Sequence, residues 1–191
     1  MATVRTASRA VLVVAAFLAV AAACSRLSAT EAPEPAPAGG PTAVDAAFVQ
    51  HMLPHHRRAI EVGELAAARG TDPRVRAFGR RIVAEQTPEE QRLTSWVTEL
   101  GLTPQSGDAT AAAGWIDDAT LARLTAAPAA EFDRDVLLAS ADSETGAAEM
   151  SRLELDGGTF GPARELATSI STAPTGELPE LRRLAADLPG S

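Results

Sequence analysis

Hydrophobic residues recur every three or four positions along most of the chain after residue 42, which is the spacing of one face of an α-helix. The first such stretch predicts a helix that begins at Thr42 or Asp45 and ends at Arg69, with Gly70 as its stop. Alanine is abundant, and aromatic residues make up only 4% of the chain, which favours helices over strands. Its apolar positions are Val44, Phe48, Met52, Ile60 and Leu65.

A second helix is predicted from Pro73 to Gly101, with Asp72 as its N-cap and the proline in its first turn. Within it, Thr87-Pro88-Glu89-Glu90 has the form of a capping box, so we expect a kink or a restart there. The later part of the chain predicts a loop over 102–114, a short helix over 117–125, a third long helix over 129–155 and a fourth from Pro162 to Leu188 that is interrupted near Pro174.

The two halves of this helical region are related at an offset of 88 residues without any gap. Asp45 corresponds to Asp133, and Ile82 corresponds to Ile170. Such a repeat predicts that a helical hairpin was duplicated, giving an all-α four-helix bundle. Further matching pairs are Glu61 with Glu149, Leu65 with Leu153, Gly70 with Gly158, Thr71 with Thr159, and Arg76 with Arg164.

The N-terminus is typical of an export signal, which we predict to be residues 1–23. Arg5 and Arg9 provide a basic start, and the apolar run that follows is too short for a membrane span. Small residues directly before Cys24 resemble the lipobox of bacterial lipoproteins, in which the cysteine carries the lipid anchor. Simple secretion with cleavage at an Ala-x-Ala site is the alternative. Residues 24–41 are rich in proline and alanine and predict an extended linker, followed by one domain over 42–191.

The charge balance of the chain argues against nucleic acid as a partner. The chain carries 17 basic and 25 acidic residues, and losing Arg5 and Arg9 with the signal would change the net charge from −8 to −10. An acidic exported chain is a poor candidate for binding nucleic acid. Cys24 is the single cysteine, which excludes both an intrachain disulfide and a zinc site built from several thiolates.

All three histidines lie in one run of six residues, His51-Met52-Leu53-Pro54-His55-His56. On a helix, His51 and His55 share a face, as do Met52 and His56. Imidazole and thioether together are ligands for a soft or borderline metal, above all copper. The adjacent His55 and His56 point about 100° apart on a helix, so ligands from another helix would have to complete a site. We considered Met150 and Glu149 for this role, and Gln86 as a partner that orients a ligand.

The pattern Asp45-x-x-Phe48-x-x-x-Met52-x-x-His55-His56-x-x-Ala59-x-Glu61, followed by Ile82-x-x-x-Gln86 and Trp96, resembles the bacterial family known as domain of unknown function 305. The resemblance covers residues 45–188 and is specific in the first half only. It implies a ferritin-like four-helix bundle, export or lipid anchoring in many members, and copper binding through methionines and histidines in some.

The second half departs from that family, in which Met-x-x-His-His is often repeated. Here it reads Ser140-x-x-Ser143-Glu144, and the methionine-rich stretch that other members carry between the halves is missing. This degenerate half makes copper storage at high capacity doubtful. We therefore predict a metal site at Met52, His55, His56 and His51, with a homo-oligomer as one way to supply further ligands.

Two other classes of function were weighed. A non-metal scaffold or interaction module of the cell envelope would use the histidines as structural residues. An enzyme is not expected, because the chain has no Gly-x-Ser-x-Gly elbow, phosphate loop or His-Glu-x-x-His motif, and no glutamate lies three residues before any histidine. A copper site that reacts with peroxide stays open as an alternative.

Overall fold

A computed structural model of the chain describes residues 40–103, 114–172 and 174–188. The described part is helical and lies in one compact unit, Pro37–Ser191. The predicted signal over 1–23, Cys24, the linker up to residue 39 and most of the loop over 102–114 fall outside the described residues. The helices are α1 (Ala43–Arg69), α2 (Pro73–Glu99), α3 (Asp118–Ala126), α4 (Ala129–Gly157), α5 (Gly161–Thr172) and α6 (Pro174–Asp187).

The ends of α1 and α2 follow the signals in the sequence. Thr42 and Asp45 form a reciprocal capping box at the start of α1, and Gly70 follows its last turn. Asp72 caps α2 by accepting a hydrogen bond of 2.7 Å from the Arg74 N–H. After α2, Gly101 has a φ of 62°, a left-handed conformation that glycine adopts without steric cost. The predicted bounds of both helices are therefore confirmed to within two residues.

Of the predicted kink or restart inside α2, the restart is wrong. The helix continues from Pro73 to Glu99 through Thr87 and Pro88. The Thr87 hydroxyl donates a hydrogen bond of 2.6 Å to the carbonyl of Val83, one turn earlier, instead of capping a new helix.

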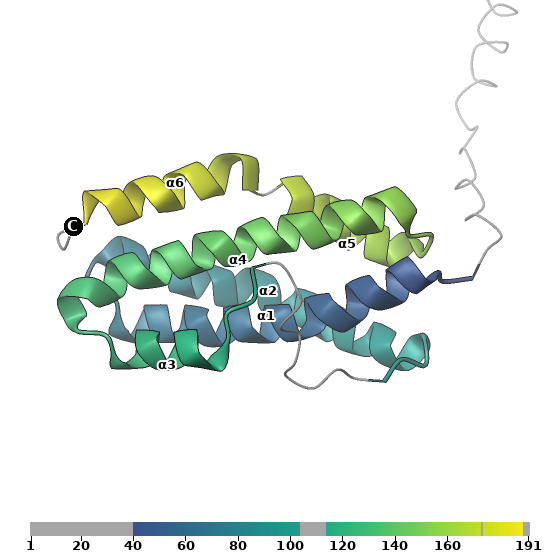
Figure 1. Cartoon of the computed structure of the whole chain (residues 1–191), viewed down its shortest axis with the longest axis horizontal. Helices are drawn as coiled ribbons and strands as arrows, with labels where there is room; N and C mark the ends of the chain where they lie inside the picture. Colours follow the sequence, from purple (N-terminus) through teal and green to yellow (C-terminus); the bar gives the residue numbers. More distant parts are fainter. Residues whose placement is uncertain (1–39, 104–113, 173, 189–191) are drawn as a thin grey trace, which may run out of the picture. The chain divides into compact units, whose positions relative to one another are not determined.

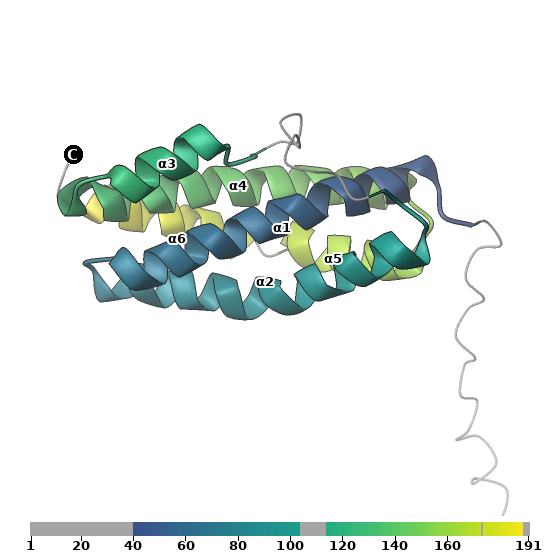
Figure 2. The same cartoon turned by 90° about the horizontal axis from the view of Figure 1, so that it is seen from below.

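The helices form two antiparallel hairpins, which confirms the predicted four-helix bundle (Figure 1). The first hairpin consists of α1 and α2, and the second consists of α4 with α5 and α6 end to end. The hairpins match the 88-residue offset, because α4 ends 88 residues after α1, α5 begins 88 residues after α2, and α6 ends 88 residues after α2. In both views α1 runs alongside α4 (Figure 2). None of the described helices is long and apolar enough to cross a membrane.

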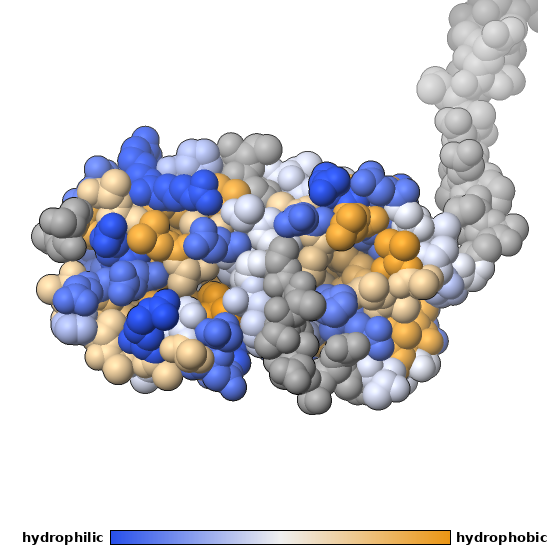
Figure 3. All heavy atoms as spheres, in the orientation of Figure 1, coloured by the Kyte–Doolittle hydropathy of each residue, from blue (hydrophilic) through white to orange (hydrophobic). Residues whose placement is uncertain are grey.

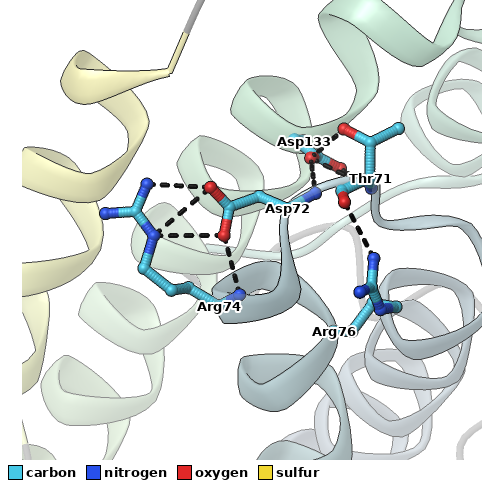
Figure 4. Close-up of polar contacts among 5 residues, drawn as sticks. All are labelled: Thr71, Asp72, Arg74, Arg76 and Asp133. Carbon is cyan, nitrogen blue, oxygen red and sulfur yellow. Dashed lines mark hydrogen bonds and ion pairs between the residues drawn. The ribbon is translucent and has the colours of Figure 1, made fainter.

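Each hairpin has one buried aspartate that accepts hydrogen bonds from the turn of the other hairpin. Asp133 accepts hydrogen bonds from the N–H groups of Thr71 and Asp72, at 2.9 and 2.6 Å, and from the Thr71 hydroxyl at 2.6 Å (Figure 4). Asp45, at the corresponding position, accepts from the N–H groups of Thr159 and Phe160 at 2.8 and 2.7 Å. Each carboxylate therefore satisfies backbone donors that the start of a helix leaves unpaired.

The interior contains two apolar clusters rather than one. One cluster joins the C-terminal half of α1, the N-terminal halves of α2 and α4, and α6. The other joins the N-terminal half of α1, the C-terminal halves of α2 and α4, and α5. Between them, each of the three long helices carries polar residues that face inward. We call this set, which consists of His55, His56, Gln86, Glu89, Ser143 and Glu144, the polar layer.

Candidate metal site

The polar layer places two of the predicted ligands in the centre of the bundle. His55 and His56 are each only 2% exposed, although they are adjacent on α1. Their ring centroids lie 6.4 Å apart and the rings are inclined at 54°. The two imidazoles therefore face different neighbours, as the 100° rotation between adjacent helical residues requires.

His55 points toward α4. Its Nε2 lies 3.2 Å from the hydroxyl oxygen of Ser143, which is its own counterpart in the repeat. Burial and the neighbouring His56 lower the pKa of His55 to about 4, although the hydrogen bond with Ser143 acts in the opposite direction. His55 is therefore neutral at neutral pH. Its Nδ1 is buried and has no hydrogen-bond partner.

His56 points toward α2. Its Nε2 lies 2.9 Å from Oε2 of Glu89. A carboxylate can only accept a hydrogen bond, so Nε2 is the nitrogen that donates, and in the corresponding neutral tautomer the lone pair lies on Nδ1. That Nδ1 is buried without a hydrogen-bond partner. The same arrangement, with one ring nitrogen donating to a carboxylate and the other left free, orients histidines that bind metals.

A polar cavity of about 230 Å³ adjoins His56. Glu85, Glu89 and Glu144 line it together with Gln86, whose Nε2 donates a hydrogen bond of 3.0 Å to Glu144. Gln86 therefore donates to a carboxylate, and its expected role in orienting a metal ligand stays a prediction. Within the described ranges, no three side chains of histidine, cysteine, aspartate or glutamate are arranged to hold a metal ion.

The other two predicted ligands lie elsewhere. Met52 is completely buried in the apolar cluster that contains α5. His51 lines a separate, largely apolar cavity of about 360 Å³ between α1 and α4, together with Met150. The structure therefore brings His55 and His56 into one layer but directs His51 to another place. Glu149, which we considered as a further ligand, is exposed.

The site residues that sequence reasoning missed are Glu89, Ser143 and Glu144. The last two were visible in the repeat, because they stand opposite His55 and His56 at the 88-residue offset. Equivalent positions of a duplicated hairpin meet only near the pseudo-two-fold axis between the copies, as His55 and Ser143 do, and the offset alone does not show which positions lie there. The sequence around Glu89 was misleading, because it has the form of a capping box and predicted the start of a helix instead of a site residue.

A buried carboxyl pair, Asp45 and Glu154, lies where the start of α1 meets the end of α4. Burial alone would raise the pKa of Asp45, but hydrogen bonds from Thr42 and from the Phe160 N–H outweigh it and hold that pKa well below its ordinary value. Burial and the neighbouring Asp45 raise the pKa of Glu154 to about 8. At neutral pH the pair therefore carries one negative charge, on Asp45.

The profile of the family described as "Domain of unknown function (DUF305)" matches residues 45–185. The chain belongs to the DUF305 family. That match covers both hairpins, including the degenerate second one. The comparison with proteins of curated function finds no match.

Solved structures similar to this chain include two other DUF305 proteins. The protein from Streptomyces coelicolor, which is described as secreted, is 20% identical with a TM-score of 0.68, over 78% of this chain and 97% of that one. A fragment from Deinococcus radiodurans is 24% identical with a TM-score of 0.70, over 78% of this chain and 100% of that one.

A third similar structure is CopM in its Cu(I)-bound form. It is 19% identical with a TM-score of 0.62, and the match covers 75% of this chain and 96% of that one. CopM is also solved with Cu(II) and with Ag bound. At these identities the three likenesses establish the shared fold, which is the ferritin-like helical bundle that the sequence predicted.

Proposed function

We propose that this DUF305 protein is exported or lipid-anchored at the cell envelope and binds copper as Cu(I) through Met52, His55 and His56, whereas His51 faces a separate cavity. Its role is binding or trafficking of the ion and not catalysis. An acidic chain with an export signal and a cysteine in a lipobox-like context supports the location. In a cell fractionation, wild-type protein is expected in the membrane fraction and the Cys24→Ser variant in the soluble envelope fraction.

The observation that carries the metal proposal is the environment of His56. Its pairing with Glu89 uses Nε2 and leaves a buried Nδ1 that has no hydrogen-bond partner. A buried polar atom without a partner costs roughly 1–3 kcal/mol, and a bound metal ion would remove this cost. A neutral His55, with a second unpartnered Nδ1, lies beside it.

The chemistry of the ligands favours a soft ion. Thioether and imidazole groups suit Cu(I) and Ag(I), whereas zinc sites need four harder or thiolate ligands. The copper- and silver-bound structures of CopM, which has the same fold, agree with this choice. Because Ser143 and Glu144 replace the histidine pair in the second half, we expect few ions per chain.

The test is a Cu(I) titration of residues 37–191 under reducing conditions, with a competing chelator to set the affinity. This segment is one compact unit, and the solved relatives consist almost entirely of the same domain. It also lacks Cys24, so no thiol contributes to binding. The variant His55→Ala/His56→Ala is expected to bind Cu(I) at least about tenfold more weakly, a difference of roughly 1.4 kcal/mol.

One observation favours the alternative of a scaffold without metal. Each of these two histidines already has a protein partner on one ring nitrogen, as a structural histidine would. Equally weak Cu(I) binding by the wild type and the double variant would support that alternative. Circular dichroism of both proteins shows whether the variant keeps its helices.

A further inference from the structure

A cavity of about 640 Å³ lies between the N-terminal half of α2 and α6. Because α2 packs mainly against α1 and α6 packs mainly against α4, these two helices leave a space between them. Phe78 and Leu181 give the cavity a buried apolar floor. Arg74, Arg81 and Arg183 line it as well. We propose that this cavity binds a fatty carboxylate, with its anionic head at the arginines and its alkyl chain on the apolar floor.

The α2 side of the cavity is basic, although the chain is acidic. Residues 73–84 contain four arginines and no aspartate or glutamate, whereas the whole chain has 25 acidic and 17 basic residues. A cluster of one sign of charge around a hollow with apolar walls attracts ligands of the opposite charge. This part of the surface therefore favours an anion, unlike the chain as a whole.

The repeat shows which of these arginines the fold requires. Arg76 and its counterpart Arg164 each donate a hydrogen bond, of 2.8 and 2.9 Å, to the carbonyl of the glycine that follows the preceding helix. Arg74 and Arg81 have no basic counterpart, because the second half has a proline and a serine at the corresponding positions. The second hairpin thus forms without cations at these two places, and the fold alone does not explain them.

One end of the cavity is already neutralised by carboxylates. The start of α2 and the end of α6 lie at the same end of the bundle (Figure 2). There Arg74 forms an ion pair of 2.8 Å with Asp72. The hydrogen bond from Asp72 and the charge of Asp187 both raise the pKa of Arg74. We therefore do not expect the head of the ligand at this end.

The part of the cavity away from that end has a cation without a partner. Glu180 is the one lining carboxylate there, together with Arg81 and Arg183. Arg182 forms an ion pair of 3.8 Å with Asp142, whereas Arg183 has no ion pair or hydrogen bond with any residue that the structure describes. A guanidinium in this state can hold a carboxylate through two parallel hydrogen bonds. We therefore expect the head of the ligand at Arg183.

The apolar floor has the dimensions of an alkyl chain. Arg74 and Arg81 are seven residues apart on α2, which is about 10 Å along the helix axis. Phe78 and the half-buried Leu184 lie between the charged groups, and the volume is that of a small-molecule site. Figure 3 shows hydrophilic and hydrophobic residues side by side over α6, which is the mixture that an amphiphilic ligand matches.

The test is isothermal titration calorimetry of residues 37–191, which form one compact unit, with sodium decanoate as the probe. The titration is made at neutral pH, where the carboxyl group is ionised. Saturable binding of one decanoate per chain is expected. Decyltrimethylammonium has the same alkyl chain with the opposite charge, and acetate has the charge without the chain. Both are expected to bind at least about tenfold more weakly than decanoate.

Arg183→Gln and Arg182→Gln are a matched pair of variants, because both remove one positive charge from an exposed position of α6. Arg183→Gln is expected to weaken decanoate binding at least about tenfold, and Arg182→Gln less than about twofold. Circular dichroism shows that each variant keeps its helices. Equal weakening by the two variants, equal affinity for the three probes or no saturable binding of decanoate would overturn this site. None of these results bears on the copper proposal, which concerns other residues.

Discussion

In the first hairpin, α1 and α2 approach each other at Gly63 and Gly79, whereas the corresponding residues of the second hairpin are Ser151 and Ala167. A Cβ atom on Gly79 would lie 2.4 Å from the carbonyl oxygen of Gly63. The first hairpin is therefore closed by direct backbone contact, while the second must accommodate side chains at the same place. The same arrangement of helices therefore accommodates two kinds of contact between the helices of a hairpin.

The centre of the two hairpins differs more than their ends do. Both halves keep the aspartate that satisfies the start of a helix in the opposite hairpin, at Asp45 and Asp133. In contrast, His55 and His56 face a hydroxyl and a carboxylate where the repeat would have a second histidine pair. The contacts that define the bundle have been retained in both copies, and the residues suited to chemistry only in one.

The largest expected effect comes from giving the first hairpin a side chain at its closest approach. Gly79→Ala forces a methyl group into backbone atoms of α1 that are less than 3.0 Å away, so the helices must move apart. We expect a loss of about 2–4 kcal/mol in the free energy of unfolding, measured by urea denaturation.

Gly161→Ala, at the start of α5, is the matched control, because a Cβ there meets no atom within 4 Å. It is expected to change stability by less than about 1 kcal/mol. Equal effects of the two substitutions would mean that the first hairpin is no more tightly packed than the second.

Glu154 should make the stability of the bundle depend on pH. Its pKa is about 8 in the folded protein and 4.5 ordinarily, so the folded state binds more protons between these values. The free energy of unfolding therefore falls as pH rises from 4.5 to 8, by up to about 1.4 kcal/mol per unit. Glu154→Gln should remove about 1–2 kcal/mol of this decline between pH 6 and 8.5.

Urea denaturation at the two pH values measures this difference, and Asp45 stays ionised throughout the range because its pKa is lowered. Glu149→Gln, an exposed substitution on the same helix, should leave the pH profile of the wild type unchanged. Parallel profiles for Glu154→Gln and the wild type would show that Glu154 is already ionised at pH 6. Ala66 is the residue of the first hairpin that corresponds to Glu154, so we expect this pH dependence to come from the second hairpin only.

The smallest expected effect concerns the contact between the halves at the polar layer. Ser143→Ala removes the hydroxyl next to Nε2 of His55 and should cost about 1 kcal/mol in the free energy of unfolding. Ser151→Ala is the same substitution on the same helix, but the hydroxyl of Ser151 is buried without a partner. It should be neutral or slightly stabilising, and a loss equal to that of Ser143→Ala would argue against a hydrogen bond to His55.

The helices could be predicted because their ends carry local signals. Thr42, Asp72 and Gly70 mark helix ends by hydrogen bonds within a few residues, and such contacts can be seen in the sequence. The repeat then gave the topology. The prediction of a restart at Thr87 failed because the local pattern is ambiguous. A threonine hydroxyl can also donate a hydrogen bond to the preceding turn of a continuous helix.

The candidate site was less predictable, because it depends on which helix each histidine faces. Spacing places His51 and His55 on one side of α1, yet the neighbouring α4 presents Met150 to one and Ser143 to the other. The direction of His56 was fixed by Glu89 on α2, which no spacing within α1 can indicate. Whether Met52, His55, His56 and His51 bind copper stays a prediction.

The contact of His55 with the residue 88 positions later has a consequence for how this bundle arose. In a dimer of two identical hairpins, a residue on the symmetry axis meets its own copy, so one mutation changes both sides of the contact together. Joining the hairpins in one polypeptide removes that coupling. An imidazole facing a hydroxyl at this point is a pair that a symmetric ancestor could not have encoded, so the two halves diverged here after the fusion.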